Sequence, residues 1–149
     1  MSAPVVVEQV GAAATHPLRA TLLRQGRPVE IAGDDDPATL HLAARLPSGE
    51  VVGVLRLHPQ ACAWRTAERP WQLRAMATDP AVRGTGAGRA LVTDALARLT
   101  AAGADLVWCD ARAAAVGFYE RLGFVVVTDV FDVPLVGPHH GMVVGLPVS

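Results

Sequence analysis

The sequence predicts a mixed α/β domain in which a mostly antiparallel central sheet is flanked by helices. Three observations support this prediction. The chain has 149 residues, the length of one ordinary domain. With 51% hydrophobic and 18% charged residues, it is too apolar for disorder. Strand-like and helix-like apolar periods alternate along it without a repeat or a linker. We therefore expect residues 1–149 to form a single domain around one core.

The first half of the chain predicts one helix among four strands. The helix begins at the Thr-His-Pro sequence of residues 15–17 and ends at Gly26 and Pro28. Strands are predicted at residues 5–10, 39–46, 51–57 and 71–78. A Pro-Ser-Gly-Glu turn joins the second of these strands to the third, and this turn predicts an antiparallel hairpin.

The second half of the chain predicts two helices and three strands. Apolar residues recur at helical spacing between Gly88 and Ala102, and Gly103 ends this helix. A second helix is predicted at residues 111–122, with Gly123 as its C-terminal cap. Strands are predicted at residues 106–109, 125–133 and 142–148, the last of them after a loop at residues 137–141.

The composition excludes several classes of function. All 13 cationic residues are Arg, so the chain has no Lys for a Schiff base or a Walker phosphate site. Ser48, the one serine away from the termini, lies in a turn rather than in a nucleophile elbow. Cys62 and Cys109 lack the spacing of a disulfide framework, which fits a reduced, cytoplasmic protein. No apolar run approaches the ~20 residues that span a bilayer. The net charge of -1 is too neutral for a nucleic-acid binder, so we expect neither a membrane nor a nucleic acid as partner.

A glycine-rich turn, Arg-Gly-Thr-Gly-Ala-Gly at residues 83–88, joins a predicted strand to the amphipathic helix. Small residues let the backbone approach a ligand, and the start of a helix offers unpaired N–H donors with a positive dipole. The turn lacks the Walker ending, and Arg89 stands where Rossmann spacing requires Gly. A plain strand-to-helix connection is the alternative. Because Arg83 and Arg89 bracket the donors, we favour a site for a diphosphate.

These residues resemble a known pattern. Arg-x-x-Gly-x-Gly at the start of a helix, here Arg83, Gly86 and Gly88, is similar to the acetyl-CoA loop of the GNAT superfamily of N-acetyltransferases. In that superfamily a strand with a bulge precedes the loop, and residues 73–78 would be that strand here. The resemblance therefore implies a GNAT-like domain with acetyl-CoA as co-substrate.

A second motif of the same superfamily follows about thirty residues later, and two motifs in the right order are more specific than one. It consists of an aromatic-Tyr pair and a Gly-aromatic pair, here Phe118-Tyr119 and Gly123-Phe124. The Pro-His-His-Gly-Met sequence at residues 138–142 further resembles the ElaA-like branch of the superfamily.

The resemblance implies direct transfer of an acetyl group to a primary amine of a small molecule or a peptide. It places Tyr119 at the thioester sulfur as general acid, and a phenol of pKa about 10 suits a departing thiolate; a plain core tyrosine is the alternative. His139, beside His140 in the expected loop before the last strand, is a candidate general base, and two exposed loop histidines are the alternative. The residues expected to contact the cofactor are Met76, Ala77, Thr78, Arg83, Gly84, Thr85, Gly86, Ala87, Gly88, Arg89, Arg112 and Phe118.

Several features stay open at this point. Many members of the superfamily have Asn near the start of the second helix, and here Arg112 stands at that position. The Asp-Asp-Asp run at residues 34–36 is expected to be a solvated loop, and no metal is expected because the histidine pair lacks a third ligand. His41 and His58 face either the core or a cleft, and Cys109 is expected to pack in a strand. The apolar last strand permits a homodimer. A domain that binds acyl-CoA as a sensor or an interaction module, without turnover, is the alternative function.

Overall fold

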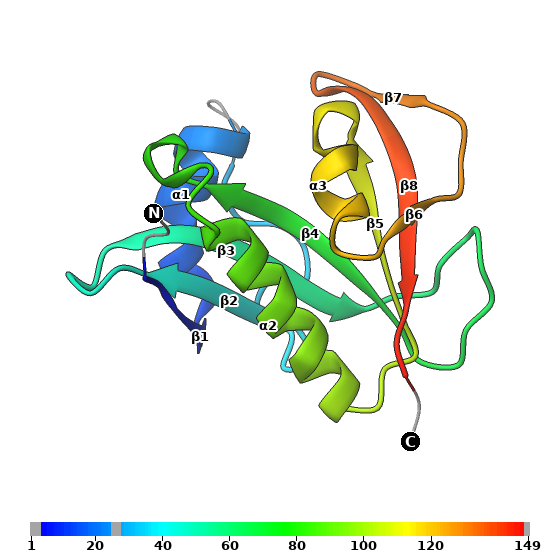
Figure 1. The fold of residues 1–149 in the computed structure, drawn as a ribbon, viewed down its shortest axis with the longest axis horizontal. Coiled ribbons are helices and arrows are strands. Elements are labelled where there is room, and N and C mark those ends of the chain that lie inside the picture. Colours follow the sequence, from blue (N-terminus) through cyan, green and yellow to red (C-terminus); the bar gives the residue numbers. More distant parts are fainter. Residues whose placement is uncertain (1–3, 25–27, 148–149) are drawn as a thin grey trace. The chain divides into compact units, whose positions relative to one another are not determined.

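The computed structural model describes residues 4–24 and 28–147 (Figure 1). Eight strands form one sheet in the order β1-β2-β3-β4-β5-β8-β6, and β7 pairs with β8. β4 and β5 pair parallel. β2 is antiparallel to β1 and β3, and β8 is antiparallel to β5, β6 and β7. The predicted fold class, a mixed and mostly antiparallel sheet with flanking helices, is confirmed. The chain divides into two compact units, and each is described by itself.

The first unit comprises the described residues up to His58 together with Arg74–Ala95. Its strands are β1 (Val6–Val10), β2 (Leu40–Arg45), β3 (Val51–Pro59) and the end of β4 (Pro70–Thr78). β2 and β3 pair antiparallel with Ala43 opposite Val54, so the predicted hairpin is confirmed. The last residue of β3 and the first four of β4 belong to the second unit.

Helices cover both faces of the strands in the first unit (Figure 1). Three short helical segments follow one another here: η1 (Ala12–Thr15), α1 (His16–Arg19) and η2 (Ala20–Arg24). On one face, Ala43 and Val54 pack against Leu18 of α1 and Leu22 of η2. On the other face lies the beginning of α2 (Ala87–Ala101). A Cβ added at Gly53 would lie 3.4 Å from a methyl group of Leu91 in this helix. Successive residues of β3 thus face opposite helices.

The predicted N-terminal helix is confirmed as these three successive helical segments. Its expected stop at Gly26 lies outside the described residues. The predicted helix from Gly88 to Ala102 is also confirmed, because α2 begins and ends within one residue of those limits. Gly103 then turns the chain with φ +89°, a conformation that glycine adopts without steric cost.

The second unit comprises Pro59–Leu73 and the described residues from Leu96 onward. Its main strands are β5 (Leu106–Arg112) and β8 (Gly137–Gly145), which pair antiparallel, and Pro70–Gln72 of β4 pair parallel with β5. β6 (Val125–Val126) and β7 (Phe131–Val133) are short partners of β8.

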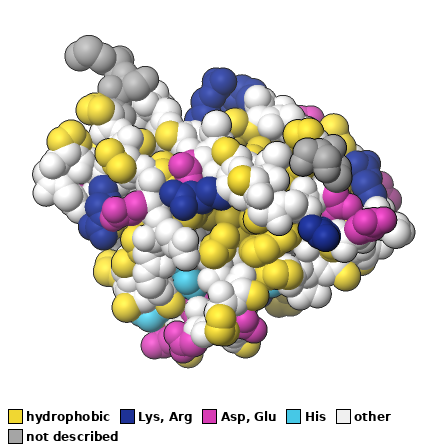
Figure 2. Space-filling model, turned by 90° about the horizontal axis from the view of Figure 1, so that it is seen from below, with side chains coloured by type: hydrophobic (Ala, Val, Ile, Leu, Met, Phe, Trp, Pro, Cys, Tyr) yellow, Lys and Arg dark blue, Asp and Glu magenta, His cyan; other side chains and the backbone are white. Residues whose placement is uncertain are grey.

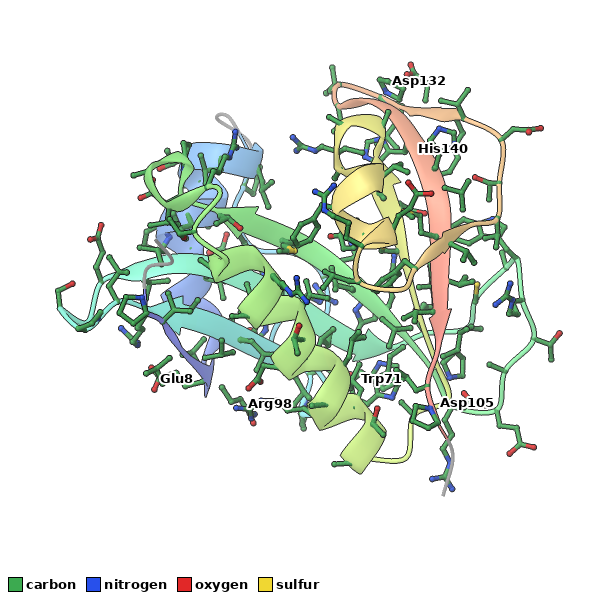
Figure 3. The ribbon with its side chains drawn as sticks, viewed as in Figure 1. Glu8, Trp71, Arg98, Asp105, Asp132 and His140 are labelled. Carbon is green, nitrogen blue, oxygen red and sulfur yellow. The ribbon has the colours of Figure 1, made fainter. Side chains whose placement is uncertain are left out.

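One face of β5 and β8 is covered by the connection at residues 60–69. Trp64 of this connection packs against Trp108 edge to face, with ring centroids 5.3 Å apart, and against Phe131 at 6.4 Å. Asp105, labelled in Figure 3, anchors the connection because its carboxylate accepts the N–H groups of Glu68 and Arg69 at 2.9 Å. These hydrogen bonds hold the pKa of Asp105 below its ordinary value.

The other face of β5 and β8 is covered by the helix α3 (Val116–Glu120), which follows a 3-10 turn, η4 (Ala113–Ala115). Tyr119 and Phe124 are buried there with ring centroids 5.2 Å apart. Gly123, with φ +97°, ends the helix as predicted.

Three predicted boundaries in this unit are wrong. The helix predicted from residue 111 begins at Val116, because β5 continues to Arg112 to pair with β8. The strand predicted at residues 125–133 is two short strands, β6 and β7. The last strand begins at Gly137 rather than at Met142, and the predicted end at Val148 lies outside the described residues. In each case cross-strand pairing, which local sequence does not encode, sets the limit.

Within residues 4–24 and 28–147, the structure contains no helix with the length and apolar character needed to cross a membrane.

Candidate functional site

The backbone of β4 is irregular just before the glycine-rich turn. Ala75 has φ +52°, in the left-handed region that non-glycine residues rarely adopt. Such a residue within a strand marks a local break in the regular ladder. Beyond it, Ala77 is buried and Met76 and Thr78 are half-buried. The irregularity expected over residues 73–78 therefore has a definite position at Ala75.

A tight turn connects this strand to α2. Asp79 begins a 3-10 turn, η3 (Pro80–Val82), by accepting the N–H of Ala81 at 2.9 Å. The hydroxyl of Thr85 donates to the carbonyl oxygen of buried Val82 and ties the glycine segment to this turn. Gly84 and Gly86 then have φ +78° and +92°, which side-chain-bearing residues adopt only with strain. The glycines are thus required by the backbone path itself.

The turn presents the start of α2 to solvent. The first hydrogen bond into the helix runs from Ala90 N–H to Gly86 O at 2.9 Å, so the N–H groups of Ala87 to Arg89 precede the helical ladder. Arg83, Gly84, Gly86 and Arg89 are exposed. The first turn holds Arg89 and no acidic residue. A cation at the positive end of a helix is unfavourable by about 0.3–1 kcal/mol, and a bound anion would offset this. The arrangement can therefore hold an anion such as a phosphate.

Tyr119, in the second unit, is buried between two aromatic rings. Its ring centroid lies 5.1 Å from that of Phe118 and 5.2 Å from that of Phe124, both edge to face. Burial raises the pKa of the Tyr119 phenol, and the neighbouring Cys109 acts in the same direction. The phenol therefore stays protonated over the whole working pH range, and it can act there as a proton donor.

His139 and His140 lie within the strand β8 and not in a loop, contrary to the prediction. His139 is buried, its ring stacks on Phe131 with centroids 6.1 Å apart, and its Nδ1 lies 2.8 Å from Gly137 O. A carbonyl oxygen only accepts, so Nδ1 carries a proton in this contact. His140, labelled in Figure 3, is half-buried with its Nδ1 3.4 Å from Thr128 O.

The two candidate acid–base residues lie on opposite faces of β8 in the second unit. A Cβ added at Gly141 would lie 2.6 Å from the ring of Trp64, so His139, two residues earlier, is on the Trp64 face. A Cβ added at Gly123, at the end of α3, would lie 3.8 Å from Val144, so even-numbered residues of β8 face the helix that carries Tyr119.

Arg112 and Cys109, two further residues considered in the sequence, both lie in β5. Arg112 is exposed and is the last residue of β5, opposite His139, and it directly precedes η4, the helical turn that leads into α3. Cys109 is buried in the same strand, and burial raises the pKa of its thiol to about 12. It is a packing residue there and not a reactive thiol.

The first unit contains a buried ionic cluster that was not predicted from the sequence. Asp34, expected in a solvated loop, accepts from Arg19 Nη1 at 2.7 Å and from Arg56 Nη1 at 3.0 Å. His41 joins the cluster through Nε2, 3.0 Å from Asp34 O. The prediction for Asp34 is wrong because two arginines, distant in sequence, surround its carboxylate. One residue of the sequence does indicate a buried charge: Arg56 stands between Leu55 and Leu57 inside an apolar strand.

The surface charge is mixed. On the face shown in Figure 2, acidic and basic side chains are interspersed, in keeping with the net charge of -1. Local arrangements such as the start of α2 therefore decide which charged ligands are attracted.

Comparisons with known proteins agree with this architecture. Residues 11–124 match the model of the acetyltransferase (GNAT) family. The chain is 29% identical over 136 residues to the uncharacterized N-acetyltransferase YitI of Bacillus subtilis, covering 89% of this chain and 91% of that protein. Among solved structures, Escherichia coli ElaA has a TM-score of 0.71 at 22% identity, covering 95% of this chain and 99% of that one. The E. coli GNAT family N-acetyltransferase YhbS, solved in complex with CoA, has a TM-score of 0.69 at 20% identity, covering 99% and 84%.

Proposed function

Because the chain belongs to the GNAT acetyltransferase family, we propose that it transfers the acetyl group of acetyl-CoA to a primary amine by direct attack. The amine nitrogen forms a bond to the thioester carbon, the carbon–sulfur bond breaks, and CoA leaves as a thiol. The amine proton passes to a base. The acceptor is a small-molecule amine or a peptide amine.

The exposed start of α2 is the observation that supports this proposal most directly. The N–H groups that precede the helical ladder, together with Arg83 and Arg89, bind the diphosphate of acetyl-CoA. Gly84 faces open space, because a Cβ added there would meet nothing within 4 Å. The backbone can therefore approach a ligand closely at this point.

The irregular part of β4 supplies backbone groups near the reacting carbonyl. The left-handed conformation of Ala75 interrupts the regular backbone of β4 next to the main-chain groups of Met76–Thr78. We assign these groups to the pantetheine arm, with one N–H left to stabilise negative charge on the carbonyl oxygen. Positioning of this kind lowers the barrier by several kcal/mol without a specialised side chain.

Because Tyr119 and His139 lie on opposite faces of β8, we assign them to different reactants, Tyr119 to the sulfur of CoA and His139 to the amine. The phenol of Tyr119, kept protonated by burial, donates to the departing sulfur. The Nδ1–H of His139 is held by Gly137 O, so Nε2 can accept the amine proton directly or through a water molecule. Arg112 and Phe118 are proposed cofactor contacts of the second unit.

Substitution of Gly86 tests the cofactor site. Gly86→Glu places a carboxylate against the proposed diphosphate, and we expect the affinity for acetyl-CoA to fall at least about 100-fold in calorimetric titration. Gly86→Gln adds similar bulk without charge and separates the two effects. Gly49→Glu is the matched control, because Gly49 has φ +91° in an exposed hairpin turn with nothing within 4 Å of a Cβ.

Retained acetyl-CoA affinity in Gly86→Glu would show that the cofactor binds elsewhere. Free-thiol release with a panel of amines then distinguishes turnover from binding. If the protein binds acetyl-CoA and no amine gives thiol release, the sensor alternative replaces the enzyme.

A further inference from the structure

Exposed apolar side chains are concentrated on one edge of the second unit. Among residues 4–24 and 28–147, five large hydrophobic residues are exposed, and four of them lie between positions 125 and 135. They are Val125 and Val126 of β6, Val130 before β7 and Leu135 after it, with exposed fractions of 49%, 38%, 58% and 90%. Single exposed apolar residues are ordinary, but a concentration along one edge indicates a surface that contacts another molecule. We call residues 125–135 the outer segment.

The outer segment is also an open edge of the sheet. β6 and β7 pair with β8 on one side, and no described strand pairs with their other side. Asp132, labelled in Figure 3, lies opposite Pro138 of β8, and proline has no N–H to donate. These two residues therefore cannot exchange two hydrogen bonds, and in such an antiparallel pair the main-chain groups point away from the partner strand. The N–H and C=O of Asp132 thus face the open edge, where an extended peptide can pair with them.

The backbone holds Leu135 in its exposed position at a conformational cost. Val136 N–H donates to Val133 O at 3.0 Å, so residues 133–136 form a β-turn with Pro134 and Leu135 at its centre. Leu135 has φ +68°, and a left-handed residue at the third position of a turn is normally Gly or Asn. A leucine there loses both a favourable conformation and the burial of its side chain. Because such outliers cluster at functional sites, we take Leu135 as the anchor of a contact surface.

The charges of the outer segment select the kind of partner. Asp129 and Asp132 are exposed, and the chain has no Lys and no Arg after Arg121. A second copy of this chain that paired through β7 would bring Asp132 opposite its own counterpart, which is unfavourable for like charges. A partner that carries cationic side chains beside apolar ones is complementary to this edge.

From these observations we propose that the outer segment binds an extended segment of another protein in which Arg or Lys alternates with apolar residues. The bound segment pairs with the main chain of Asp132 and adds a strand to the sheet. Its cationic side chains lie beside the carboxylates of Asp129 and Asp132, and its apolar side chains contact Leu135. The proposal concerns a surface of the second unit and does not depend on acetyl transfer.

Two synthetic hexapeptide amides test the proposal. One alternates Arg with Val, and the other alternates Glu with Val as the charge-reversed control. Fluorescein on each N-terminus leaves no free amine, so the measurement reports binding without turnover. We expect the arginine peptide to bind at least about 10-fold more tightly than the glutamate peptide in fluorescence anisotropy. The difference should shrink as salt is raised from about 50 to about 500 mM.

Variants separate docking from folding. Asn is well suited to a left-handed residue, so we expect Leu135→Asn to leave Tm unchanged or to raise it by up to about 4 °C. The same variant should bind the arginine peptide at least about 10-fold more weakly. Asp132→Asn should reduce the preference for the arginine peptide over the glutamate peptide. Val6→Asn is the matched control, because Val6 is 69% exposed on β1, at the other end of the strand order, and it should change binding less than about two-fold.

Three results would overturn the proposal. The first is equal binding, or no binding, of the two peptides by the unaltered protein. The second is a Leu135→Asn variant that retains full affinity for the arginine peptide. The third is a dimer in sedimentation velocity that Leu135→Asn dissociates, because this would assign the outer segment to a second copy of the chain.

Discussion

Replacing Asp34 with Asn should destabilise the protein far more than removing a surface ion pair. Asn keeps the size of the side chain but removes the charge that two buried guanidinium groups share. The carboxylate accepts three hydrogen bonds at 2.7–3.0 Å, from Arg19, Arg56 and the N–H of Ile31. Breaking a buried ionic group by removing one partner costs about 3–5 kcal/mol. We expect about 3 kcal/mol for Asp34→Asn, which still accepts hydrogen bonds, and about 5 kcal/mol for Asp34→Ala.

The measurement is urea unfolding at pH 7, with thermal unfolding as a second readout. For a chain of this size each kcal/mol lowers Tm by about 2–4 °C, so Asp34→Asn should unfold roughly 6–12 °C lower. Glu8→Gln is the control, because the Glu8–Arg45 pair is 45% and 35% exposed and such pairs contribute only about 0–1 kcal/mol. A loss in Asp34→Asn no larger than that in Glu8→Gln would refute the structural role of the cluster.

The difference in stability between the unaltered protein and Asp34→Asn should depend on pH. Burial alone would raise the pKa of Asp34, but hydrogen bonds from Arg19 and Ile31 and the charges of both arginines outweigh it and lower the pKa. A carboxyl whose folded pKa is depressed contributes stability that is present above its unfolded pKa of about 3.9 and is lost as pH falls through the folded pKa. The difference between the unaltered protein and Asp34→Asn should therefore be constant from pH 7 to 5 and shrink below about pH 4. A difference that grows on acidification would contradict this assignment.

Three further predictions concern the second unit. Tyr119→Phe keeps the aromatic packing, so we expect kcat to fall about 100-fold with Kd for acetyl-CoA nearly unchanged; an unaltered kcat would remove Tyr119 from the mechanism. Gly141→Ala should lower the free energy of unfolding by about 1–3 kcal/mol, because the new methyl group would lie 2.6 Å from the ring of Trp64. Gly145→Ala, on the same strand with nothing within 4 Å, should have little effect, and equal losses in the two variants would refute the steric explanation. In the native protein a maleimide should modify one of the two thiols, because Cys109 is buried with its pKa raised to about 12; fast modification of both would show that this strand opens.

Local sequence was sufficient for the first unit's strands and for the turn before α2. The hairpin of β2 and β3 is predicted because its turn and its apolar runs are adjacent in sequence. The turn at residues 83–88 is predicted because glycine spacing and a following amphipathic pattern are local signals. These features depend on neighbours only a few residues apart.

The errors have a common physical origin in long-range pairing. His139 belongs to β8 because it pairs with Arg112, and the same pairing extends β5 into the stretch expected to be helical. The burial of Asp34 depends on Arg56, which lies 22 residues away in sequence. No local pattern encodes such partners, so His139 and the ionic cluster could be located only in three dimensions.

The connection at residues 60–69 also gives the molecule an internal optical probe. All three tryptophans of the chain, Trp64, Trp71 and Trp108, belong to the second unit, and two of them are in ring contact. Their emission reports the state of that unit alone, whereas circular dichroism reports strands and helices of both. Both signals can be recorded on one unlabelled sample of Asp34→Asn. If the first unit unfolds before the second, circular dichroism changes before tryptophan emission, and if the whole chain unfolds cooperatively, the two signals change together.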